Sequence, residues 1–160
     1  MTIIVFGLPG SGKSFFASAL AELMGAEYIK TDSIRAQSFN RSYSMEDKLQ
    51  VYDAVLNRTI EMLQEKKNVV VDATFYKYGI RQKFNDQCKE FGDVYFIEVQ
   101  ADELVIRERL KTPRIDSDAD FEVYKKVKTD WEPLTEDHLV LQSTNTNREE
   151  MLEKAITYLH

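Results

Sequence analysis

Short apolar runs alternate along this chain with stretches in which apolar residues recur at helical spacing. Five runs rich in β-branched and aromatic residues predict strands over residues 2–6, 26–30, 68–73, 93–100 and 138–142. Between them, a recurrence every three or four residues predicts helices over residues 13–24, 44–66, 79–91, 102–110, 117–133 and 148–159. This alternation is typical of an α/β fold, a five-stranded parallel sheet with right-handed crossovers and helices on both faces.

Several predicted helices carry boundary residues. Ser44 begins a capping-box pattern, Gly25 and Gly92 are C-terminal stops, and Ser117 is a candidate N-cap for a helix that Pro133 ends. Two helices show an apolar face, made of Phe15, Phe16, Ala19, Leu20 and Leu23 in the first and of Phe121, Tyr124, Val127 and Trp131 in the last but one. We expect these faces, and Trp131 with them, to serve packing.

Length and charge narrow the classes of function. The chain has 160 residues, so one domain over residues 1–160 is expected, and its net charge of −6 argues against an extended nucleic-acid duplex as a ligand. The lone cysteine, Cys88, cannot form an internal disulfide, and its spacing from Phe84 and Phe91 predicts a core thiol. Without a leader-like N-terminus or an apolar stretch of about 20 residues, we expect a cytoplasmic protein with no membrane partner.

The segment GLPGSGKS at Gly7–Ser14 follows the first predicted strand and opens the first predicted helix. A helix N-terminus has unpaired N–H groups and a favourable dipole for anions, and glycines let the backbone approach phosphate oxygens. Lys13 then supplies charge to the β- and γ-phosphates, and the Ser14 hydroxyl is placed to bind Mg²⁺. The expected nucleotide-binding residues are Gly7, Pro9, Gly10, Ser11, Gly12, Lys13 and Ser14.

Polar residues follow three other predicted strands. Ligands of open α/β sheets bind outside the carboxyl ends of the strands, so these residues are expected to face the phosphate-binding loop. They are Asp32 and Arg35 after the second strand, Asp72 and Thr74 at the end of the third, and Ser143, Thr144 and Asn145 after the fifth. We expect Thr144 and Asn145 to contribute to the nucleotide site.

Asp32, Arg35 and Asp72 are the residues whose chemistry fits phosphoryl transfer. Asp32 could accept the proton of an attacking hydroxyl as a catalytic base, and the planar fork of Arg35 suits a phosphate or carboxylate on the acceptor. Asp72 ends an apolar strand, where nucleotide-binding proteins place an aspartate that holds Mg²⁺. The alternatives are that Asp32 caps a short helix, that Arg35 is solvated, and that Asp72 caps a turn.

A polar, irregular stretch suggests a lid over about residues 107–131. Arg109 and Arg114 lie in it, and a guanidinium over the nucleotide would neutralise charge that develops during transfer. For Arg107 we expect a solvated helix face with Glu103 and Glu108, which is also the alternative for Arg109 and Arg114.

With these residues in place, the chain resembles small P-loop kinases of the polynucleotide kinase type, within the broader group of AAA-type ATP-binding kinases. The resemblance covers nearly the whole chain. It rests on GLPGSGKS, TDSIR, VVVDATFYKYGIRQKF, the Arg109–Arg114 lid, and SDADFEVY leading to WEP. It implies ATP and Mg²⁺ at Lys13 and Ser14, Asp32 as base, and Arg35 on the phosphate of the acceptor, with Arg109 and Arg114 acting from the lid.

The acceptor stays open among three alternatives. The resemblance implies the 5′-hydroxyl of a short nucleic-acid end or of a nucleotide-like small molecule. A DxxR pattern like that of Asp32 and Arg35 also occurs in adenylylsulfate kinases, so a kinase for a nucleoside, a sugar or adenylylsulfate is the second reading. The third is a regulatory NTPase without a phosphoryl acceptor.

Overall fold

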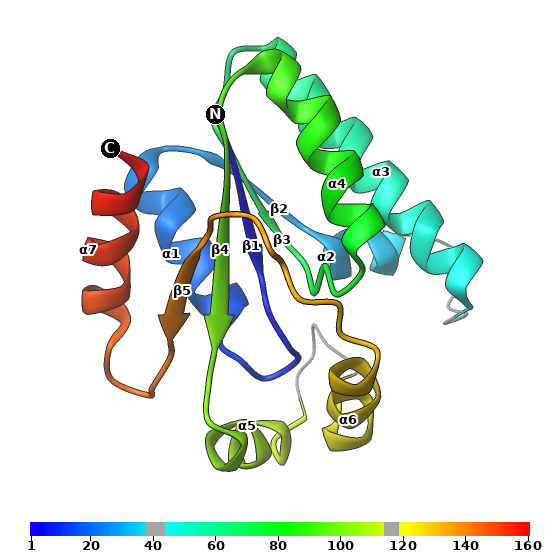
Figure 1. Cartoon of the computed structure of the whole chain (residues 1–160), viewed down its shortest axis with the longest axis vertical. Coiled ribbons are helices and arrows are strands. Elements are labelled where there is room, and N and C mark those ends of the chain that lie inside the picture. The colour runs from blue at the N-terminus through cyan, green and yellow to red at the C-terminus, as the bar shows by residue number, and fades with distance from the viewer. Residues whose placement is uncertain (38–43, 114–118) are drawn as a thin grey trace.

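Five parallel strands form one sheet through the centre of the molecule (Figure 1). The structure is a computed structural model that describes residues 1–37, 44–113 and 119–160. The strand order is β2-β3-β1-β4-β5, and each neighbouring pair is parallel. The strands are β1 (Thr2–Phe6), β2 (Glu27–Lys30), β3 (Val69–Asp72), β4 (Val94–Gln100) and β5 (Leu139–Gln142). The predicted fold class is confirmed.

Helices cover both faces of this sheet (Figure 1). Among the described residues they are α1 (Lys13–Met24), α2 (Thr31–Gln37), α3 (Met45–Gln64), α4 (Tyr78–Cys88), the 3₁₀ turn η1 (Lys89–Phe91), α5 (Glu103–Leu110), α6 (Phe121–Thr129) and α7 (Arg148–Leu159). Helices α1 and α7 pack on one face and α3 and α4 on the other, whereas α5 and α6 lie beyond the carboxyl ends of the strands. None of the described helices combines the length and apolarity needed to cross a membrane.

The central strand β1 supplies side chains to both layers. Ile3 and Val5 belong to the core under α1 and α7, while Ile4 and Phe6 belong to the core under α3 and α4. Successive side chains of a strand point to opposite faces, so a strand covered on both sides reads as a continuous apolar run. For this reason the β1 sequence shows neither the alternation of a strand with one exposed face nor the apolar spacing of a helix.

The apolar face predicted for the first helix is only partly buried. Phe16 and Leu20 lie in the core, but Phe15 is 62 % exposed and Leu23 59 % exposed. A helix that packs on a sheet buries one narrow stripe, and here the small side chain of Ala17 completes it. The Phe15 ring instead lies against Arg148, whose guanidinium carbon is 5.2 Å from the ring centre.

The helix predicted over residues 117–133 is shorter than expected. Its N-cap is Asp120, whose side chain accepts a hydrogen bond from the Val123 backbone N–H at 2.9 Å, while Ser117 lies outside the described residues. Trp131 follows the end of α6 and stacks on Phe6, with the ring centres 6.1 Å apart. Trp131 is a packing residue as expected, although it is not on a helical face. Cys88 is fully buried, in agreement with the predicted core thiol.

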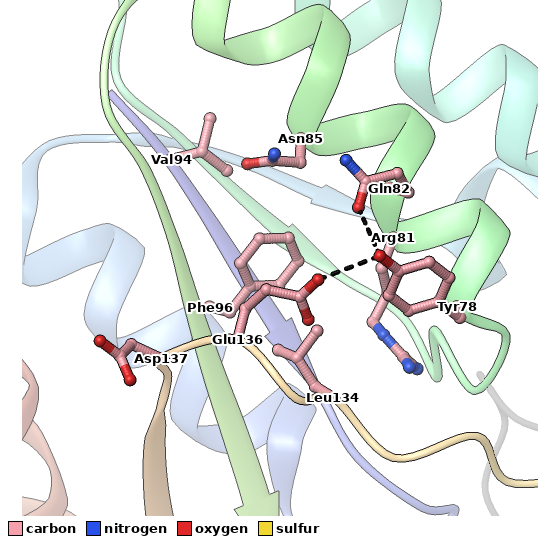
Figure 2. A pocket seen from close by; sticks show the side chains of 9 residues that line it. All are labelled: Tyr78, Arg81, Gln82, Asn85, Val94, Phe96, Leu134, Glu136 and Asp137. Carbon is pink, nitrogen blue, oxygen red and sulfur yellow. Dashed lines mark hydrogen bonds between the residues drawn. The ribbon is translucent and has the colours of Figure 1, made fainter.

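A buried cation joins the β3–α4 connection to the segment that precedes β5. The Arg81 side chain is 1 % exposed and donates hydrogen bonds to the backbone carbonyls of Phe75 and Glu132. Removal from water lowers the pKa of its guanidinium. Figure 2 shows Arg81 at the edge of a cavity of about 140 Å³ between α4 and this segment.

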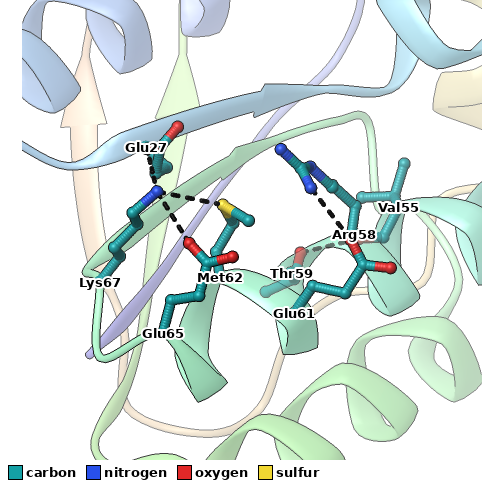
Figure 3. A network of polar contacts seen from close by, with 8 residues as sticks. All are labelled: Glu27, Val55, Arg58, Thr59, Glu61, Met62, Glu65 and Lys67. Atoms are coloured by element: carbon teal, nitrogen blue, oxygen red, sulfur yellow. Dashed lines mark hydrogen bonds and ion pairs between the residues drawn. The ribbon is translucent and has the colours of Figure 1, made fainter.

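We expect Arg81→Met to lower the free energy of unfolding by about 3 kcal/mol, because the buried Phe75 carbonyl and the partly buried Glu132 carbonyl would lose their donor. Urea unfolding followed by circular dichroism measures the change. Arg58→Met is the matched control, since Arg58 is an exposed residue of α3 that pairs with Glu61 at 3.0 Å (Figure 3) and should change stability by less than about 0.5 kcal/mol. Equal effects of the two substitutions would contradict the structural role of Arg81.

Candidate active site

The phosphate-binding loop lies between β1 and α1, where its glycines are required by close contacts. A side chain at Gly7 would place its Cβ 2.3 Å from the Val99 carbonyl oxygen. Gly12 is the N-cap of α1 and has a left-handed backbone with φ of 91°. Because this N-cap has no side chain, no capping group of its own occupies the N–H groups of the first turn. The loop therefore presents backbone donors of the kind that bind phosphate.

Arg109 connects this loop to the segment that follows β5. From α5, its guanidinium donates to the Gly10 carbonyl oxygen at 3.1 Å and to the Ser143 Oγ at 3.2 Å. It also donates to the Asn145 Oδ1, at 3.2 Å from Nη2 and 3.3 Å from Nε. Ser143 and Asn145 thus lie near the loop, as expected for residues that follow a strand end, and Arg109 reaches them from α5. Thr144 is exposed, and its hydrogen bonds to other described residues are local, to Asn147 and Thr146.

Asp32 and Arg35 lie one helical turn apart on α2. The Asp32 carboxylate is 3.8 Å from Lys30 Nζ and 4.0 Å from Arg35 Nη1. Helix α2 begins at Thr31, so Asp32 belongs to its first turn and is not its N-cap. The Arg35 side chain is only 29 % exposed, which disfavours a fully solvated residue. Both alternatives raised by the sequence are therefore weakened.

The surroundings of Asp32 raise the pKa of its carboxyl, which favours a role as proton acceptor. Burial raises the pKa of this carboxyl above its ordinary value of 3.8, and the nearby Asp72 carboxylate raises it further. The positive charges of Lys13, Lys30 and Arg35 oppose this rise without cancelling it. A carboxylate with a raised pKa is a stronger base than an ordinary aspartate.

Asp72 lies at the carboxyl end of β3, beside the start of the loop. Asp72 is 1 % exposed and pairs in register with Val5 of β1 and Lys30 of β2. Oδ2 accepts a hydrogen bond from the Tyr28 hydroxyl at 2.7 Å, whereas Oδ1 is buried and has no hydrogen-bond partner among the described residues. A buried carboxylate oxygen is costly to leave unpaired, so this atom fits a cation.

The described residues contain no cluster of three His, Cys, Asp or Glu side chains that could hold a metal alone. Mg²⁺ commonly uses one or two protein oxygens together with phosphate oxygens of the substrate. Ser14 and Asp72 are the side chains that would hold it here. Tyr28 was missed in the sequence, because a tyrosine in a short strand has the pattern of a packing residue.

The predicted lid is described in part. Arg114 lies outside the described residues. Arg107 pairs with Glu103 at 3.5 Å and lies 4.4 Å from the ring centre of Phe121, so it joins α5 to α6. This residue therefore packs and pairs as expected for a helix face, and closure of a lid stays a prediction.

The chain matches one family model, described as an AAA domain (AAA_33), over residues 2–134. No curated protein matches the sequence.

The fold recurs in solved structures of low sequence identity. A sugar kinase from Janibacter sp. is 19 % identical, with a TM-score of 0.77 and coverage of 99 % of this chain and 93 % of the other. An APS kinase from Mycobacterium tuberculosis, in complex with AMPPNP and APS, is 17 % identical with a TM-score of 0.74 and coverage of 99 % and 96 %. Chaetomium thermophilum Kti12, in complex with ADP-AlF3, is 18 % identical with a TM-score of 0.71 and full coverage of 100 % of both chains. These similarities establish a P-loop NTPase fold.

Proposed function

The chain belongs to the AAA domain family AAA_33, and we propose that it is a kinase. It would transfer the γ-phosphoryl group of ATP to a hydroxyl acceptor. The observation that carries the proposal is the position of Asp32. Its carboxyl is close enough to Lys13 of the phosphate-binding loop for the lysine to lower its pKa, and it lies beside Arg35. A phosphate-binding loop facing a base and a second cation has the parts of both a donor site and an acceptor site.

The proposed reaction uses these residues in separate roles. The loop N–H groups and Lys13 bind the ATP phosphates, and Asp32 accepts the proton of the acceptor hydroxyl as its oxygen forms a bond to the γ-phosphorus. The bond from that phosphorus to the bridging oxygen breaks, and ADP leaves with the electron pair. Mg²⁺, when bound, supplies positive charge to the β- and γ-phosphate oxygens. Arg109 contacts the donor loop, which suits it to stabilise bound nucleotide.

We propose a 5′-hydroxyl of a short nucleic-acid end or nucleotide-like molecule as the acceptor, with Arg35 binding an adjacent phosphate. A small-metabolite acceptor is the second candidate. It is favoured by a groove of about 450 Å³ between the N-terminal parts of α3 and α4, a volume typical of small-molecule sites. Tyr52 of α3 lines this groove, and α3 packs against α2, the helix that carries Asp32 and Arg35.

The test is transfer of label from γ-labelled ATP to separate panels of 5′-hydroxyl oligonucleotides, nucleosides, sugars and adenylylsulfate. Labelled oligonucleotide would support the first acceptor class, and a labelled small molecule the second. Label released only as inorganic phosphate, with every panel tested, would overturn the kinase proposal in favour of a regulatory NTPase.

Arg35→Ala should raise KM for a phosphate-bearing acceptor about tenfold or more, because a hydrogen bond from a charged group contributes about 1.5–3 kcal/mol. KM for ATP should change little, since Lys13 and the loop bind the nucleotide. Steady-state kinetics with each substrate varied in turn measures both values. Arg58→Ala on the exposed face of α3 is the control, and an unchanged acceptor KM in Arg35→Ala would remove Arg35 from this role.

A further inference from the structure

Tyr28 connects β2 to Asp72, one of the two side chains proposed to hold Mg²⁺. It pairs in register with Val70 of β3, so Asp72 is its diagonal neighbour two residues further along that strand. Diagonal neighbours on one face of a sheet are within reach of an aromatic side chain, and here the phenol reaches Asp72 Oδ2 at 2.7 Å. The ring itself packs on the core under α1, the helix that carries Ser14.

The phenol is held as a hydrogen-bond donor. Its oxygen lies 2.7 Å from Asp72 Oδ2, and an ionised carboxylate can only accept a hydrogen bond, so the phenol donates. The proton of the Tyr28 hydroxyl is therefore directed at Asp72.

The two oxygens of Asp72 differ in their surroundings. With Oδ2 bound by the phenol, the rotation of the carboxylate is fixed and Oδ1 is left buried without a partner among the described residues. A free rotation about the terminal torsion would otherwise let the carboxylate turn either oxygen toward the loop. Hydrogen-bonded neighbours of metal ligands commonly fix ligand orientation in this way.

We infer that Tyr28 is a positioning residue that orients Asp72 for Mg²⁺ in the nucleotide complex. The inference rests on the proposed function, because it concerns the same site. It differs from a packing role for Tyr28, which would require only that the ring fill space against the core.

The test is the Mg²⁺ dependence of binding of a fluorescent, non-hydrolysable ATP analogue, titrated to wild-type protein and to Tyr28→Phe. The variant keeps the ring and removes only the hydroxyl. We expect the Mg²⁺ concentration at half-saturation to rise about tenfold, in the range found when partners of metal ligands are removed. Affinity for the analogue in EDTA should stay the same, because the loop and Lys13 bind the phosphates without the metal.

Two further variants make the result specific. Tyr95→Phe on β4 is the matched control, since Tyr95 packs against Tyr158 with ring centres 5.7 Å apart at the α7 side of the sheet; it should leave the Mg²⁺ dependence unchanged. Asp72→Asn should itself raise the Mg²⁺ concentration at half-saturation. If Tyr28 acts through Asp72, adding Tyr28→Phe to Asp72→Asn should raise that concentration little further.

An unchanged Mg²⁺ half-saturation in Tyr28→Phe would overturn the inference, even if the melting temperature fell, because a packing role predicts that combination. The binding assay contains no acceptor and involves no transfer. If the wild-type protein phosphorylated no acceptor, the proposed function would be wrong, but the result for Tyr28 would not be affected. The two failures can therefore be told apart.

Discussion

Lys13→Met is expected to lower kcat for phosphoryl transfer about 10³-fold, the loss typical of removing one charged group that stabilises a transition state. Lys13 is the first residue of α1, directly after the glycine that caps the helix. A methionine keeps the aliphatic length of the side chain and removes the charge that would offset the negative charge of the transferred group. Steady-state kinetics with the identified acceptor measures the change. Lys154→Met, at an exposed ion pair with Glu150 on α7, is the control.

The same substitution should change the pH dependence. The positive charge of Lys13 is the largest of the influences that lower the pKa of Asp32, so its removal raises that pKa further. Because the base must be ionised to accept a proton, the acidic limb of the residual kcat/KM profile should move to higher pH. A loss of activity with an unshifted acidic limb would show that Lys13 and Asp32 do not act on the same reaction centre.

Asp32→Asn is expected to lower kcat by about 10²- to 10⁴-fold, the contribution of a positioned general base, while ATP affinity stays nearly unchanged. The amide keeps the shape of the side chain and cannot accept the proton. Asp53→Asn is the control, because Asp53 is an exposed carboxylate of α3 paired with Lys83 at 2.7 Å. Full transfer activity in Asp32→Asn would remove Asp32 from the role of base.

Asp32→Asn should also make the fold more stable at neutral pH. The folded-state pKa of Asp32 is raised above the ordinary value of 3.8, so the folded protein binds this proton more tightly than the unfolded chain does. The ionised carboxylate therefore lowers stability as pH rises through the window between the two pKa values. Below that window both states are protonated and the difference disappears. Melting curves for both proteins from about pH 3 to pH 8 would show this, and equal melting temperatures at neutral pH would contradict it.

Sequence alone was sufficient where the relevant residues are close together along the chain. Strand β1, the loop Gly7–Ser14 and helix α1 form one continuous segment, and its glycine spacing and apolar run are local patterns. Asp32 and Arg35 are three residues apart, so helical geometry alone brings them to the same side. The cap at Ser44 was likewise correct, since its side chain accepts from the Asp47 backbone N–H within one turn.

Tertiary structure decided the contacts between distant residues. The order β2-β3-β1-β4-β5 places Asp72 between the ends of two strands, and the Tyr28 hydroxyl reaches it across 44 positions of sequence. Arg109 reaches Gly10 across 99 positions, and Arg81 reaches Glu132 across 51. Strand order and register set these distances, and neither is encoded in a local pattern. The sequence by itself thus determined the phosphate-binding loop and the fold class, while only the assembled sheet determined which side chains surround the proposed metal and acceptor sites.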